Sequence, residues 1–173
     1  MKGHATKLIE LTENNAEKIA RQWLKDVRMN PRTPTYHNFS DEKALAQAHQ
    51  FYTNFRALFC TNKPFDAASK FFTKYADERY SEGIPLHEAL YALILMRRHI
   101  WLYAEFQAMF VTAVEQHQAA ESLTRTILMF DYSIYVMSQR YEELMELEME
   151  ERLHTGVKPG AFRHRVIFGG LSK

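Results

Sequence analysis

The sequence contains one Glu-x-x-His motif, formed by Glu151 and His154. This spacing turns a carboxylate and an imidazole to the same side of a helix, and di-iron bundles carry the motif on two different helices. Here the single copy lies at the end of a helical pattern, in a segment rich in charged residues. These features favour a solvated helix terminus over a metal site, so we expect no metal.

Other reactive arrangements have no counterpart in the 173 residues. There is no pair of histidines spaced four apart, no second cysteine, and neither the phosphate-loop nor the dinucleotide glycine pattern. Cys60 lies near the predicted C-terminus of a helix, where the helix dipole disfavours a thiolate. A small, partly buried apolar role is therefore favoured over a redox sensor, and we expect a protein that is not an enzyme and carries no cofactor.

His99 and His117 lie within or near apolar helical segments. Such residues are candidate haem ligands or pH-responsive groups, but an isolated histidine on a helix is more often a hydrogen-bonded residue at the edge of the core. Aromatic residues make up 13% of the chain, and at helical spacing they indicate a core before they indicate a pocket for an apolar ligand. A helical protein that binds haem or another small ligand is the alternative function.

Two charged residues are hard to explain by apolar packing. Arg97 falls on the apolar stripe of residues 86–104, and Asp131 lies inside the apolar run 127–137. Because an unpaired buried charge costs several kcal/mol, the sequence predicts that Arg97 or Arg98 pairs with Asp131. Three interpretations are open. The two charges form a static salt bridge, or they reach water separately without meeting, or they line a small polar cavity that responds to a ligand. The candidate ligand pocket comprises Arg97, Arg98, His99, Trp101, Asp131 and Tyr132.

Helices are expected to position all of these residues. The chain has only six glycines and five prolines, which is typical of long helices rather than of sheets with many turns. Thr112 and Glu115 have the spacing of a capping box, which predicts a helix start. Apolar residues at three- to four-residue spacing predict helices over about 6–29, 41–60, 64–83, 86–109 and 112–153.

The expected fold is therefore all-α, a bundle of about five helices with a long C-terminal helix. Residues 1–154 form the helical bundle, and residues 155–173 form a tail that is extended or flexible. A proline-containing connector over residues 30–36 separates the first two helices, as an ordered or a flexible segment.

The charge balance limits the partners. Lys and Arg number 22 and Asp and Glu number 21, so no global field favours nucleic acid. The most apolar stretch, residues 84–114, is interrupted by charged residues and predicts no membrane span. A single cysteine and an N-terminus without an apolar run predict a cytoplasmic protein.

The C-terminal part of the long helix is the expected contact region for protein partners. Its methionines Met137, Met145 and Met149 predict a helix partner and hence a homodimer. The candidate partner-binding residues are acidic on the helix and basic or apolar in the tail: Glu146, Glu150, Arg163, Arg165 and Phe168.

Several stretches resemble the N-terminal domain of RsbT co-antagonist proteins of the RsbRD type. They include Arg21-Gln22-Trp23-Leu24, the connector Pro31-Arg32-Thr33-Pro34-Thr35-Tyr36, and Asp131-Tyr132 on the last helix. Glu82-Gly83-Ile84-Pro85-Leu86 and Arg97-Arg98-His99-Ile100-Trp101 complete the set. The resemblance runs from about residue 8 to about residue 150, and none of its motifs is a catalytic signature.

The resemblance implies a helical sensory module in bacterial stress signalling, which acts through protein contacts. A small molecule is a candidate for its signal. In that family the last helix leads into an output module. Here only about twenty residues follow the long helix, which is too few for such a module. The resemblance therefore implies output through a separate partner, or a chain that is part of a longer protein.

Overall fold

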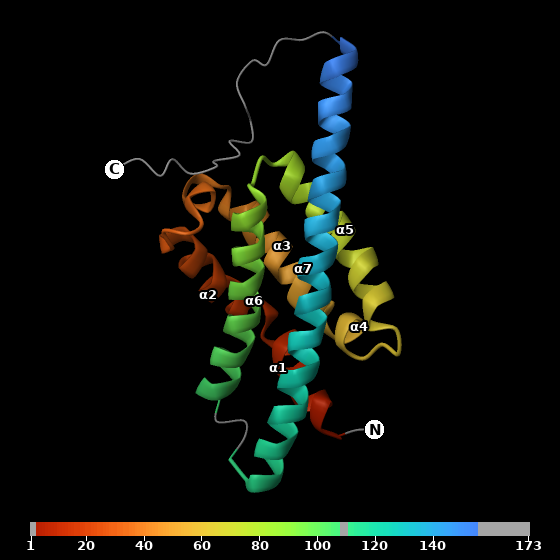
Figure 1. The fold of residues 1–173 in the computed structure, drawn as a ribbon. Helices are drawn as coiled ribbons and strands as arrows, with labels where there is room; N and C mark the ends of the chain where they lie inside the picture. Colours follow the sequence, from red (N-terminus) through yellow and green to blue (C-terminus); the bar gives the residue numbers. More distant parts are fainter. Residues whose placement is uncertain (1–2, 108–110, 156–173) are drawn as a thin grey trace, which may run out of the picture.

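The structure is a computed structural model that describes residues 3–107 and 111–155 (Figure 1). Within these ranges the chain forms helices and no strand, so the all-α prediction is confirmed. The elements are α1 (Gly3–Asn14), α2 (Ala16–Met29), the 3-10 helix η1 (Pro34–Asn38), α3 (Asp41–Thr53), α4 (Phe55–Phe59), α5 (Pro64–Ser81), α6 (Leu86–Phe106) and α7 (Ala113–Thr155).

Asparagines divide each of the first two predicted helices into two. Asn15 separates α1 from α2, and Asn54 separates α3 from α4. The side-chain amide of each donates to the carbonyl four residues earlier, at 2.9 Å from Asn15 to Leu11 and 2.8 Å from Asn54 to Gln50. Such local side-chain bonds compete with the backbone ladder, which explains a bend where no glycine or proline occurs.

The connector between α2 and α3 is ordered and belongs to the core. The hydroxyl of Thr33 donates to the Val27 carbonyl at 2.8 Å. The buried carboxylate of Glu88 accepts bonds from the backbone nitrogen of Thr35 at 2.7 Å and from its hydroxyl at 2.9 Å. Tyr36 of η1 is buried as a result.

Two predicted helix boundaries have the expected capping. At the start of α7 the nitrogen of Glu115 donates to the Thr112 hydroxyl at 3.2 Å, and the nitrogen of Thr112 donates back to the carboxylate at 2.9 Å. After α5, Gly83 has a φ of 74° and its nitrogen donates to the Tyr80 carbonyl at 2.9 Å. Gly83 therefore ends α5 in the left-handed conformation that glycine adopts without strain.

The core joins α2, α3 and α6 on one side to α5 and α7 on the other. Trp23 is fully buried, as its position on the stripe of α2 predicts, and its indole nitrogen donates to the Ala92 carbonyl of α6 at 2.9 Å. The pair α5 and α7 packs more extensively than any other pair of elements. None of the helices in the two described ranges is both long and apolar enough to cross a membrane.

The C-terminal part of α7 extends past the other helices, as the blue end in Figure 1 shows. Phe130, Met137 and Tyr141 are buried against the bundle, whereas the apolar side chains after Met145 are exposed. Leu147, Met149 and Leu153 are 56%, 62% and 82% exposed.

Candidate functional site

The prediction of a buried ion pair between α6 and α7 is wrong. Asp131 is exposed, as is Arg98, and Arg97 lies over the Phe130 ring with its guanidinium carbon 5.7 Å from the ring centroid. The prediction failed because α7 carries apolar residues on its solvent face as well as on its core face; Ile127 and Tyr135 are both exposed. The apolar run around Asp131 therefore did not indicate burial of that residue.

The aromatic members of the predicted pocket have packing roles. Tyr132 meets the Phe65 ring of α5 edge-on, with a centroid distance of 5.5 Å. Trp101 is half-buried and packs against the core.

His99 lies on α6 and faces α2. It is 8% exposed, and its Nε2 is 3.0 Å from Oδ2 of Asp26. Burial lowers the pKa of His99, although the nearby carboxylate acts in the opposite direction. This contact occupies one ring nitrogen and supports a hydrogen-bonded residue at the core boundary over a haem ligand. His117 is exposed.

A buried charge that the sequence analysis missed lies on α5. Arg79 is fully buried, with Nε 2.9 Å from Oε2 of Glu82 and Nη2 3.5 Å from Oε2 of Glu78. Its guanidinium carbon lies 4.7 Å from the centroid of the Tyr75 ring. None of the three guanidinium nitrogens has a hydrogen bond of normal geometry to a described residue. The buried hydroxyls of Tyr75 and Tyr36 also lack such a bond to a described residue. A sequence signal was present, because Arg79 continues the inward stripe of α5.

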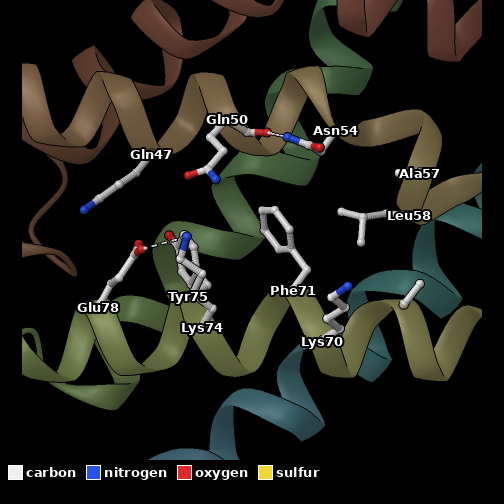
Figure 2. A pocket seen from close by; sticks show the side chains of 11 residues that line it. Gln47, Gln50, Asn54, Ala57, Leu58, Lys70, Phe71, Lys74, Tyr75 and Glu78 are labelled. Atoms are coloured by element: carbon white, nitrogen blue, oxygen red, sulfur yellow. Dashed lines mark hydrogen bonds and ion pairs between the residues drawn. The ribbon is translucent and has the colours of Figure 1, made fainter.

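A pocket of about 350 Å³ lies beside this buried cluster, between α3, α4 and α5 (Figure 2). Its apolar lining is formed by Ala57, Leu58, Ala67, Phe71 and the ring of Tyr75. Its polar lining comes from the amides Gln47 and Gln50 on α3, from Asn54 between α3 and α4, and from Lys70, Lys74 and Glu78 on α5.

The pocket and the buried cluster share residues. Tyr75 and Glu78 line the pocket and also contact Arg79, and the Gln47 amide nitrogen donates to Glu82 at 2.9 Å. None of the predicted site residues belongs to this lining. The one available signal was the spacing of Lys70, Lys74 and Glu78, which places three charged residues along one edge of a helix.

Two of the five predicted partner-binding residues lie in the described part of the chain. Glu146 and Glu150 are exposed on α7, while Arg163, Arg165 and Phe168 lie outside the described residues. Cys60 is exposed, so the expectation that it is partly buried is wrong. Its position just after the five-residue helix α4 leaves it at the surface.

Comparisons of the chain with protein-family models, with curated proteins and with solved structures found no match. The candidate site is therefore interpreted from its own geometry.

Proposed function

We propose that the protein is a cytoplasmic, non-enzymatic domain that senses or relays a signal and acts through protein contacts, as a homodimer. The observation that carries the proposal is the position of α5, which forms one wall of the pocket and also packs along α7. A ligand in the pocket would therefore act on the helix that contacts the extended α7.

Specific contacts connect the far side of α5 to α7. Nε of Arg140 donates to the Asp77 carboxylate at 2.6 Å, and the rings of Tyr80 and Tyr141 meet edge-on with a centroid distance of 5.5 Å. Tyr80 also donates a hydrogen bond to Glu148, which lies near the end of α7. A shift of α5 would therefore change contacts that lie close to the extended end of α7.

The exposed end of α7 is the proposed output surface. Glu146, Met149, Glu150 and Leu153 recur at spacings of three or four residues and therefore share one side of the helix. Apolar side chains bordered by charges are typical of a protein-contact surface. We assign this surface to a second copy of the chain or to a downstream partner.

The resemblance to the RsbRD-type N-terminal domain supports the same function, because the last helix of that domain leads to its output module. On this basis the proposed role belongs to bacterial stress signalling. A ligand-binding protein without a signalling output is the second candidate, and the pocket itself supports it.

Filling the pocket from either wall tests the sensing function. Ala67→Phe on α5 and Ala57→Phe on α4 each place a ring in the space that a ligand would occupy. We expect both substitutions to change amide hydrogen exchange over residues 142–154 of α7, in addition to residues lining the pocket.

Ala46→Phe is the matched control, because Ala46 is exposed on α3 and lies outside the pocket lining. It should leave exchange in α7 unchanged. If both filling substitutions alter exchange only in α3, α4 and α5, the pocket is not coupled to α7, and simple ligand binding becomes the better assignment.

A further inference from the structure

We propose that the pocket between α3, α4 and α5 binds a small aromatic carboxylate. This inference deepens the proposed function by naming the chemical class of the signal, and it depends on that function only for its signalling consequence. It is carried by the shape of the apolar lining and by the charges at its edges.

The apolar lining favours a planar ring. Phe71 is half-buried and packs against the rings of Phe51 at 6.2 Å and Phe72 at 5.1 Å, which leaves part of its ring available to a ligand. In Figure 2 its ring points from α5 into the space below α3. Aromatic rings interact favourably when stacked with an offset or set edge to face.

The size of the pocket favours a compact ligand. A volume of about 350 Å³ is near the lower end of the range for small-molecule sites. One or two fused rings with a short polar substituent fit this space better than a long alkyl chain.

The charges at the edge favour an anion. Nζ of Lys74 is 3.9 Å from Oε1 of Glu78, and Oε2 of the same carboxylate is 3.5 Å from Nη2 of Arg79. The charge of Glu78 is therefore offset by two cations. Lys70 is exposed and forms no ion pair with any residue in the described ranges, so it is the available cation of the pocket edge.

The opposite edge supplies neutral donors. The side-chain amide of Gln50 on α3 points toward the pocket in Figure 2. A carboxylate accepts charge-assisted hydrogen bonds from an ammonium group and further bonds from amides. An aromatic carboxylate matches the lining and both edges, whereas an organic cation would meet the repulsion of Lys70 and Lys74.

Binding of 1-naphthoate to the full chain tests the inference, measured from chemical-shift changes in the backbone amide NMR spectrum. We expect saturable shifts at residues of α3, α4 and α5 that line the pocket. The neutral analogue 1-naphthalenemethanol and the aliphatic acid decanoate should both bind more weakly than 1-naphthoate.

The variant Lys70→Gln should weaken binding of 1-naphthoate about two- to fivefold and leave the neutral analogue unchanged, because an exposed ion pair contributes modestly. Lys25→Gln is the matched control, because Lys25 is an exposed lysine of α2 away from the pocket. It should have no effect.

Three results would overturn the inference: no saturable shifts in the pocket, equal affinity for the acid and the neutral analogue, or tighter binding of decanoate. Each of these would leave the exchange experiment with the filled pocket unaffected. Conversely, binding of 1-naphthoate without any response of α7 to pocket filling would retain the ligand class and reject the sensing function.

Discussion

Arg79 places a cation in the interior next to two carboxylates that are only partly buried. The side chains of Glu78 and Glu82 are 38% and 17% exposed, whereas that of Arg79 is 0% exposed. The desolvation penalty therefore falls mainly on the guanidinium, and the carboxylates compensate it through proximity rather than through well-formed hydrogen bonds.

Removing a carboxylate and removing the cation of this cluster should have unequal effects on stability. Glu82→Gln leaves the buried cation less compensated and should lower the free energy of unfolding by about 2–3 kcal/mol. Arg79→Met removes the buried charge and lets the carboxylates turn to water, so the change should stay within about 1 kcal/mol. Urea unfolding measures both. A larger loss for Arg79→Met would show that the guanidinium itself stabilises the fold.

The imidazole of His99 should make stability depend on pH. Because burial lowers its pKa, the folded state keeps the ring neutral at a pH where the unfolded chain takes up a proton. The free energy of unfolding should therefore fall as the pH is lowered from about 6.5 toward the pKa of the folded state, with no effect well above that range.

Urea unfolding at pH 7.5 and pH 5.5 tests this dependence. His99→Gln keeps a donor for Asp26 but cannot take up a proton, so its stability should change less between the two pH values than that of the unsubstituted protein. His117→Gln, at an exposed position, should retain the full dependence. The idea fails if His99→Gln retains it too.

For single residues, the sequence predicted burial and helix position better than it predicted the contact partners of those residues. The burial of Trp23 follows from helical spacing, and the helix assignment around His99 is correct. The Asp26 partner of His99 lies 73 residues away and belongs to another helix, so no local pattern indicates it. The expected pair at Asp131 failed for the same reason, because burial depends on which side of α7 faces its neighbours.

Gly83 is the element-scale feature with the simplest energetic consequence. Its φ of 74° lies in the left-handed region, and a Cβ added there would meet nothing within 4 Å. Gly83→Ala should therefore lower the free energy of unfolding by about 1 kcal/mol through backbone strain alone. Gly83→Asn should lower it less, because asparagine tolerates this conformation.

Thermal or urea unfolding of the two variants gives the comparison. An equal and larger loss in both would indicate a steric clash instead of backbone strain, contrary to the open space around this position.

Helix starts and ends were predictable where a local motif fixes them. The capping box at Thr112, the N-cap Ser40 and the proline at the start of α5 each mark a boundary that the structure contains. The two asparagine breaks were not predicted, because asparagine costs little in a helix and the competing bond forms only when the side chain turns back.

The oligomeric state of the whole molecule gives a direct test of the proposed function. We expect the full chain to form a dimer that dissociates on dilution, as measured by analytical ultracentrifugation. The double variant Met149→Glu with Leu153→Glu should be monomeric at concentrations where the unsubstituted chain is dimeric, because it places charges on the exposed side of α7.

Leu102→Glu is the control, since this α6 residue is also exposed and apolar. It should leave the dimer intact. A dimer that survives the double substitution would exclude the end of α7 as the interface.

The pocket and the packing of α5 against α7 belong to this scale as well, and neither was predictable from the sequence. Amides of α3 and lysines of α5 come together only after α4 and residues 60–63 fold the chain back. Composition and spacing indicated helices, but they did not indicate which helices form the walls of the pocket.

The overhanging end of α7 also has a mechanical consequence. From Tyr141, the last fully buried aromatic residue on this helix, to Thr155 the axis extends for roughly 20 Å at 1.5 Å per residue. A rotation of about 10° at the Tyr141 pivot would swing the tip by roughly 3–4 Å over that arm. A tilt this small leaves the close-packed interior intact. A lever of this length nevertheless turns it into a displacement as long as a hydrogen bond.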